Sequence, residues 1–200
     1  VERHLKLDHN NLNTLPWSFG NLKIGGDLWL NNNELVTLPE SIGNLTVPGN
    51  LLLNDNKLTA LPEFIGDLTV GGNLELNNNE LVTLPESIGN LRVLGGHLSL
   101  NHNKLIALPK SIVNLAVGGT LSLNNNKLTA LPESIEDLRV LGEEHRIKWD
   151  PVRNMKDQKG GYVGLNLTLF CNNIIEFPES FKNNRGSSIL IYYQNNNDRC

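Results

Sequence analysis

The sequence predicts a stacked array of one short supersecondary unit. Three observations predict it: a Leu-Pro step that recurs at a fixed spacing, a strand-like leucine pattern before that step, and a glycine-containing turn after it. The first six prolines of this step are separated by 23, 23, 23, 24 and 23 residues; they are Pro16, Pro39, Pro62, Pro85, Pro109 and Pro132. A constant period in the twenties is typical of repeat proteins. We therefore expect function on a surface that many units build together.

One unit, residues 73–91, gives the order of the expected elements. Leu74 and Leu76 alternate with polar residues, which is the pattern of a short strand with one apolar face. Pro85 fixes its own φ and lacks a donor, and the apolar residues after it lie too close together for another strand, so a 3₁₀-like turn is expected. Glycines such as those in Val-Gly-Gly at 70–72 permit a sharp turn into the next strand.

An asparagine recurs at the same place after each strand pattern. Its amide carries both an acceptor and donors, so a buried copy can bond the backbone of the loops above and below it. Because an unpaired buried amide is costly, a polar residue locked to an apolar period predicts an internal hydrogen-bond ladder rather than a ligand site. The expected ladder comprises Asn10, Asn33, Asn56, Asn79, Asn103, Asn126 and Asn172.

The resulting pattern, LxLxxNxLxxLPxxIGxL, resembles the leucine-rich repeat over about residues 3–185. It is most similar to the 23-residue LPxxIG variety of intracellular, Ras-pathway-type and plant proteins, with similar arrays in bacteria, protists and large DNA viruses. The resemblance implies a right-handed, curved parallel β-solenoid with short strands on the concave side and turns or 3₁₀ segments on the convex side. The chain departs from this family at one position: proteins of the family usually have a leucine three residues before the strand leucine, and this chain has a glycine there. Val70 and Val117, one residue earlier, are expected to supply the missing apolar contact.

We expect one elongated domain of about eight or nine units in residues 1–195. It divides into regular units at 4–142, a degenerate unit at 143–164, a further unit at 165–187, a terminal strand at 188–195 and a tail at 196–200. The degenerate unit has lost its Leu-Pro step and carries many charges. It is either a docking loop or hinge, or a drifted repeat whose charges are solvated.

Composition excludes several classes of function. The net charge of −4 argues against a dedicated nucleic-acid or anionic-membrane surface. The only cysteines, Cys171 and Cys200, do not form cysteine-rich caps, so an intracellular, reducing compartment is expected rather than secretion. No apolar run approaches the roughly 20 residues of a membrane span.

Motifs for catalysis are absent from the sequence. There is no P-loop, no G-x-G-x-x-G and no H-E-x-x-H. The histidines form two pairs, His4 with His9 and His97 with His102, which are expected about 19 Å apart and so cannot share one metal. Asp55 and Glu75 are expected on an exposed sheet without the apolar surround that tunes an acid. We therefore expect no enzyme activity, no cofactor and no metal.

The concave face is expected to bind another protein. The partner-binding residues are Lys6, Trp29, Leu52 and Glu75 in one column and Asn31, Asn54, Asn77 and Phe170 in a second. Trp29 beside Leu52 is the best candidate for an anchor, unless the indole lies flat over neighbouring side chains. The asparagines either bond one another laterally or present a polar face to a partner or glycan. Trp17 is expected to pack at the rim of the first turn.

The predicted function is a non-catalytic scaffold for protein–protein interaction. Two alternatives stay open: a structural component of a larger assembly, such as a virion or surface layer, and the recognition domain of a larger enzyme. Leu5 and Leu7 lie near the start of the sequence with no capping repeat before them. Self-association or assembly through this end of the array is therefore expected.

Overall fold

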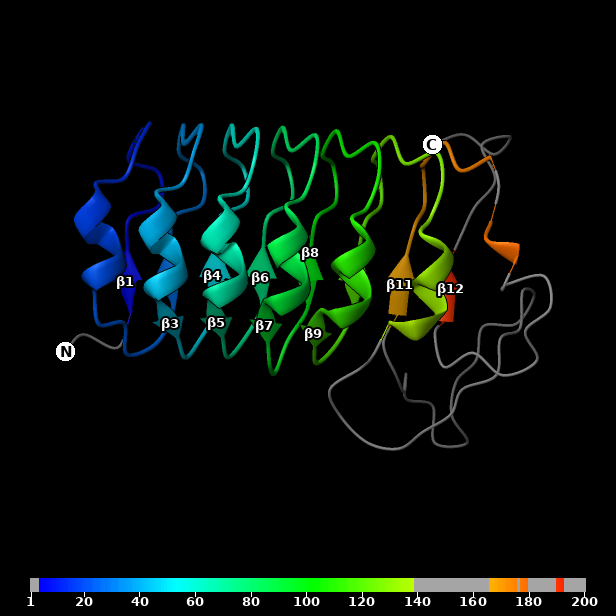
Figure 1. Ribbon diagram of the computed structural model, residues 1–200. Helices are drawn as coiled ribbons and strands as arrows, with labels where there is room; N and C mark the ends of the chain where they lie inside the picture. The colour runs from blue at the N-terminus through cyan, green and yellow to red at the C-terminus, as the bar shows by residue number, and fades with distance from the viewer. Residues whose placement is uncertain (1–3, 139–165, 176, 180–189, 193–200) are drawn as a thin grey trace, which may run out of the picture.

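The computed structural model describes residues 4–138, 166–175, 177–179 and 190–192, which form two parallel sheets and a row of 3₁₀ helices (Figure 1). One sheet has eight strands: β1 (Leu5–Lys6), β2 (Leu28–Trp29), β4 (Leu51–Leu52), β6 (Leu74–Glu75), β8 (Leu98–Ser99), β10 (Leu121–Ser122), β11 (Asn166–Thr168) and β12 (Leu190–Tyr192). The other has four: β3 (Thr46–Val47), β5 (Thr69–Val70), β7 (Arg92–Val93) and β9 (Ala116–Val117). The helices are η1 (Trp17–Asn21), η2 (Glu40–Asn44), η3 (Glu63–Asp67), η4 (Glu86–Asn90), η5 (Lys110–Asn114) and η6 (Glu133–Asp137).

Proline starts each 3₁₀ helix. Pro39 has an extended backbone with φ −66° and ψ 148°, and its carbonyl accepts the N–H of Ile42 at 2.9 Å. The N–H of Leu45 then bonds the carbonyl of Ile42 at 3.1 Å, after which the backbone is extended again. These three-residue spacings define a 3₁₀ helix, which is the short form of helix that the proline pattern predicts.

The core lies between the helices and the eight-stranded sheet, which Figure 1 shows on opposite sides of the stack. In each regular unit, leucines from the strand and an isoleucine from the helix (Phe19 in η1) point inward, and equivalent residues of successive units stack on one another. Fully buried examples are Leu28, Leu51, Leu74, Leu98, Ile42, Ile65, Ile88 and Ile112. Burying aliphatic side chains in every unit is the main favourable term for such an array.

The four-stranded sheet was not expected from the sequence. The segment before the glycines was assigned only to a turn, whereas the structure places Thr-Val or its equivalent in a second parallel ladder. Val47, Val70, Val93 and Val117 point into the core and are buried. The valine therefore fills the apolar position that the glycines leave empty, and its β-branched shape suits a strand.

The eight-stranded sheet passes from β10 directly to β11, with Leu121 opposite Leu167 and Ser122 opposite Thr168. The repeat spacing placed a degenerate unit, 143–164, at this point of the stack, and those residues lie outside the described part of the chain. The sheet order differs from that expectation because Leu167 and Leu169 supply the buried leucines next to the β10 unit. β12 then pairs with β11, within the range expected for a terminal strand.

Candidate functional site

The outward positions of the eight-stranded sheet bring four different chemistries into one row. Lys6, Trp29, Leu52 and Glu75 lie opposite one another on β1, β2, β4 and β6. Lys6 is exposed and the other three side chains are half-buried. The Lys6 Nζ lies 4.1 Å from the centroid of the Trp29 ring, which is a cation–π contact. Trp29 therefore lies under a neighbouring strand side chain and presents only part of its ring to a partner.

Glu75 lies in a more apolar place than the sequence suggested. It is half-buried between Leu52 and Ser99 in the sheet. Burial raises the pKa of the Glu75 carboxyl, while a hydrogen bond with Ser99 and the nearby His97 act in the opposite direction. The expectation of an exposed carboxylate without a tuning environment is wrong for Glu75, because flanking strands remove part of its water.

The second column of outward residues contains Asn31, Asn54 and Asn77, the asparagines that were predicted to bind a partner. The Oδ1 atoms of Asn101 and Asn124 accept the backbone N–H groups of Asn124 and Phe170, each at 2.8 Å. Asn54 donates to the Asp55 carboxylate at 2.6 Å, and the buried Oδ1 of Asn31 accepts no hydrogen bond from the described residues. In the second half of this column, the side-chain amides therefore accept hydrogen bonds from the backbone of the next unit. In its first half, the amides make fewer hydrogen bonds.

The next column has a conformational role that the sequence analysis missed. Its residues have φ between 52° and 56°; they are His9, Asn32, Asp55, Asn78, His102, Asn125 and Cys171. Asparagine and aspartate tolerate this left-handed region better than most residues, which explains why they dominate here. Neighbours also bond laterally, as Asn78 does to Asp55 at 2.8 Å. Asp55 is therefore part of a turn and does not form an acid pair with Glu75.

The asparagines after these turns form hydrogen bonds between units. Asn79 accepts the N–H of Leu58 at 3.0 Å and donates to the carbonyls of Leu53 and Leu76 at 3.0 and 3.1 Å. The same contacts recur at Asn33, Asn56, Asn103, Asn126 and Asn172, all of which are at most 8% exposed. Asn10 differs: it is exposed and its amide bonds only its local Asp8 carbonyl at 2.8 Å, because the described chain has no unit before it.

A second side-chain ladder runs along the residues just before each strand. The side chain of each member accepts the backbone N–H of its counterpart in the next unit, at distances of 2.7 to 3.1 Å. The accepting side chains are those of His4, Asp27, Asn50, Asn73 and His97, and the last backbone N–H that is bonded in this way is that of Thr120. The Asn50 N–H holds the pKa of Asp27 below its usual range. His4 and His97 therefore accept through Nδ1, and the signal in the sequence was a polar residue before the strand of each regular unit.

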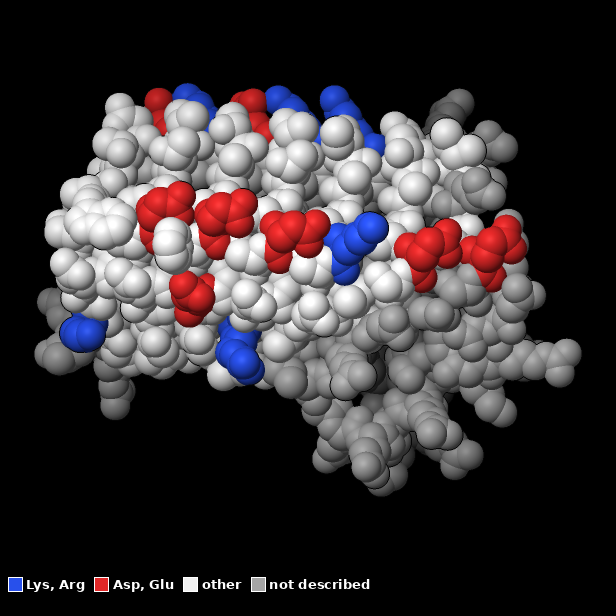
Figure 2. All heavy atoms as spheres, viewed as in Figure 1, with Lys and Arg blue, Asp and Glu red and all other residues white. Residues whose placement is uncertain are grey.

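The helix face carries a row of charges that follows the prolines. Figure 2 shows the carboxylates in one line across this face, interrupted by a cation. Trp17 takes the same position in η1 and is 67% exposed. The expectation that Trp17 packs at the rim of the first turn is wrong, because Phe19 fills the apolar slot of η1 instead.

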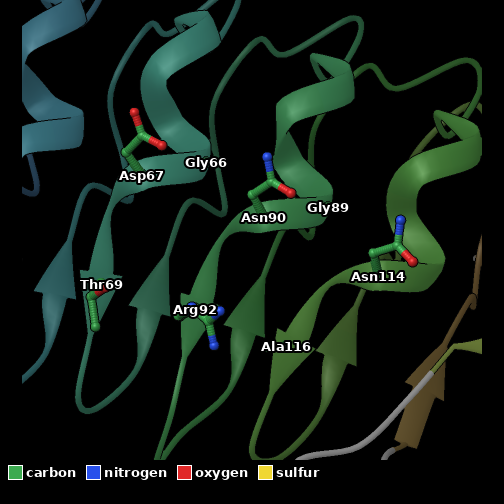
Figure 3. Close-up of a pocket in the computed structure, with 8 residues that line it drawn as sticks. All are labelled: Gly66, Asp67, Thr69, Gly89, Asn90, Arg92, Asn114 and Ala116. Atoms are coloured by element: carbon green, nitrogen blue, oxygen red, sulfur yellow. The ribbon is translucent and has the colours of Figure 1, made fainter.

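A hollow of about 510 Å³ opens between the ends of three helices and the four-stranded sheet (Figure 3). Its lining is Gly66, Asp67, Thr69, Gly89, Asn90, Arg92, Asn114 and Ala116. A Cβ on Gly66 would lie 2.3 Å from the Ser87 carbonyl oxygen, so glycine is needed for the helices to pack closely at its wall. The lining offers one carboxylate and one guanidinium among amides, which suits polar contacts but not nucleophilic chemistry.

The described residues can also be searched for a metal site and a membrane span. In them, no group of three or more His, Cys, Asp or Glu side chains is arranged to hold a metal ion. Within the same part of the chain, no helix has the length and apolar character needed to cross a membrane. Cys171 is disulfide-bonded, which is more typical of oxidising compartments than of the reducing one expected.

Comparisons with known proteins agree with this architecture. The family model described as Leucine Rich Repeat matches residues 3–22. No curated protein matches the chain. The solved leucine-rich repeat domain of a Shigella effector is 23% identical, with 96% of this chain and 81% of that chain covered and a TM-score of 0.51.

Two further solved structures resemble the chain less closely in shape. A leucine-rich repeat protein of Leptospira interrogans is 32% identical, with 94% and 54% of the two chains covered and a TM-score of 0.45. YopM from Yersinia enterocolitica is 24% identical, with 90% and 36% covered and a TM-score of 0.49. The chain thus spans about half and about a third of these two proteins. The family match, the stacked parallel strands with 3₁₀ turns and the fold shared with the Shigella domain identify the chain as a leucine-rich repeat protein.

Proposed function

We propose that this protein is a non-catalytic scaffold that binds another protein through the face of its eight-stranded sheet. The observation that carries the proposal is the row of Lys6, Trp29, Leu52 and Glu75, which places a cation, an aromatic ring, an aliphatic side chain and an acid on neighbouring strands. With strands about 4.8 Å apart, the row extends about 14 Å. Tryptophan is among the residues that most often dominate the energy of protein interfaces, so Trp29 is the expected anchor.

The neighbouring columns support this choice of interface. The residues of the turn column are constrained by their positive φ angles. In the second column, the side chains of Asn101 and Asn124 accept backbone N–H groups of the next unit, so they are already used within the fold. The first column also changes character along the stack, because its later members are Ser99, Ser122 and Thr168. A partner would therefore gain most from the first four strands, with Asn31, Asn54 and Asn77 beside them as polar contacts and Phe170 at the far end.

The test compares partner capture by variants of this face. Trp29→Ala and Leu52→Ala should each weaken capture of a native partner while the protein stays folded, whereas Ser122→Ala, on the same face, should not. Far-UV circular dichroism and a denaturant titration check that each variant is folded. Unchanged capture by the Trp29→Ala/Leu52→Ala double variant would place the interface elsewhere.

Two other roles have direct tests. A structural component of a larger assembly would co-sediment with that assembly, and self-association through the edge of β1 would appear in light scattering as a mass above that of the 22.2 kDa chain. The recognition domain of a larger enzyme would appear as a higher intact mass in the native source. We also propose an intracellular location, which the disulfide at Cys171 does not favour. Titration of free thiols in the native protein tests this: free thiols would agree with a reducing compartment, and their absence would agree with the disulfide.

A further inference from the structure

Two aromatic side chains on the helix face are not needed by the core. Trp17 in η1 is 67% exposed and Phe64 in η3 is 56% exposed. The core positions of these two helices are filled by other residues, Phe19 and Ile65, which are buried. Equivalent helices carry serine at the position of Phe64, as Ser41 in η2 does. Exposed aromatic rings that the fold does not bury are typical of an interaction surface.

Carboxylates surround these rings. Glu40 lies on η2, the helix between η1 and η3, and its Oε2 accepts the N–H of Phe64 at 3.3 Å. Glu63 is the neighbour of Phe64 in η3, and Glu86 continues the row on η4. Figure 2 shows this acidic line on the face that carries the helices. The aromatic rings therefore lie in a negative field.

Of these carboxylates, only Glu86 lies near a cation in the described part of the chain: hydrogen bonds from Ser111, together with the charge of Lys110, lower its pKa. Glu40, Glu63 and Glu86 make no ion pair within it. By contrast, the acids on the loop edge are paired between units: Glu34 bonds Lys57 at 3.2 Å and Glu80 bonds Lys104 at 2.8 Å. The protein thus pairs its charges along one edge and leaves a row of acids beside exposed aromatic rings on another.

We propose that Trp17, Phe64, Glu40 and Glu63 form a second docking surface, which binds an extended arginine- or lysine-containing segment of a partner protein. The guanidinium or ammonium groups of that segment would lie over the rings and pair with the carboxylates. Trp17 and Phe64 are two units, or about 10 Å, apart, so three or four extended residues span the surface. Carboxylates repel phosphate, so the charge complementarity favours a peptide over nucleic acid or an anionic lipid surface. The surface lies on the opposite side from the sheet interface and does not depend on it.

The experiment uses a fluorescein-labelled peptide of alternating arginine and glycine, with binding followed by fluorescence anisotropy. Phe64→Ser restores the residue of neighbouring units, and with Trp17→Ala it should weaken binding about two- to fivefold for each ring removed. Glu63→Gln should weaken binding, and added salt should weaken it further. The matched control Glu34→Gln removes the same charge at the loop edge and should have little effect, as should Trp29→Ala on the sheet.

Four results would overturn the proposal. Equal losses in Glu63→Gln and Glu34→Gln, with no effect of the ring variants, would mean diffuse attraction to net negative charge. Binding that depends on the rings but not on Glu63 or salt would mean an apolar partner. Loss of peptide binding in Trp29→Ala would place the peptide on the sheet face. A glutamate–glycine peptide should not bind, and comparable binding of that peptide would also contradict the proposal.

Discussion

Replacing Asn79 by alanine tests the energetic role of the interior amides. The Asn79 side chain accepts the N–H of Leu58, and both residues are buried. Its amide donates to the carbonyls of Leu53 and Leu76, but these oxygens also accept Asn56 at 3.1 Å and Asn103 at 3.0 Å. In the variant each carbonyl therefore keeps one donor, and the Leu58 N–H loses its partner. A single unsatisfied buried donor costs about 1–3 kcal/mol, which is the expected loss in the free energy of unfolding.

Urea denaturation followed by far-UV circular dichroism measures this loss. Asn77→Ala is the matched control, because Asn77 lies in the same loop and its side chain makes no hydrogen bond within the described residues. It should change stability by less than about 0.5 kcal/mol. Equal losses for Asn77→Ala and Asn79→Ala would refute the assignment of Leu58 as the orphaned donor.

Three other perturbations follow from the geometry. In a denaturant titration, His97→Leu should lower the free energy of unfolding by less than about 1 kcal/mol, because water can replace the bond to the exposed Thr120 N–H. His97→Asn should be neutral, since Asn73 makes the same contact in its own unit. A loss of stability in both variants would contradict the ladder. Burial raises the pKa of Glu75, so the stability from its bound proton is present below the unfolded pKa and lost as pH rises through the folded pKa. Glu75→Gln should therefore be more stable than wild type near neutral pH and lose that advantage at about pH 4; the opposite trend would mean that burial does not dominate. Gly66→Ala places a Cβ 2.3 Å from the Ser87 carbonyl and should cost about 1–3 kcal/mol in a thermal melt, whereas Asn90→Ala nearby should not.

The fold class could be predicted because the repeat averages the signal over many units. One Leu-Pro step says little, but six at nearly constant spacing fix the strand, the 3₁₀ turn and their order. The second sheet could not be predicted in the same way, since Thr69 and Val70 form a two-residue strand that is too short to show alternation. The same limit applies to the turn column, where Asn78 has the sequence signature of any polar loop residue and only its φ of 55° reveals the role.

The site was harder to predict because exposure depends on which residue fills a shared slot. Trp17 was assigned to packing at the rim of the first turn, but Phe19 occupies the apolar position of η1. Glu75 was assigned to open solvent, and its burial comes from Leu52 and Ser99 on adjacent strands, more than twenty residues away in the sequence. In both cases the decisive neighbour belongs to another position of the repeat.

The hydrogen-bonded columns also indicate where this array has room to vary. Positions before the strand, in the left-handed turn and in the interior ladder keep mostly Asn, Asp or His because each must accept a backbone N–H or tolerate positive φ. Two columns escape these demands: the outward strand position, with Trp29 and Leu52, and the position after proline, with Trp17 and Lys110. Side chains change in chemical class most freely where the fold does not specify them. Because recognition needs chemical variety, these two columns, on opposite sides of the core, are where partner specificity can be encoded without loss of stability.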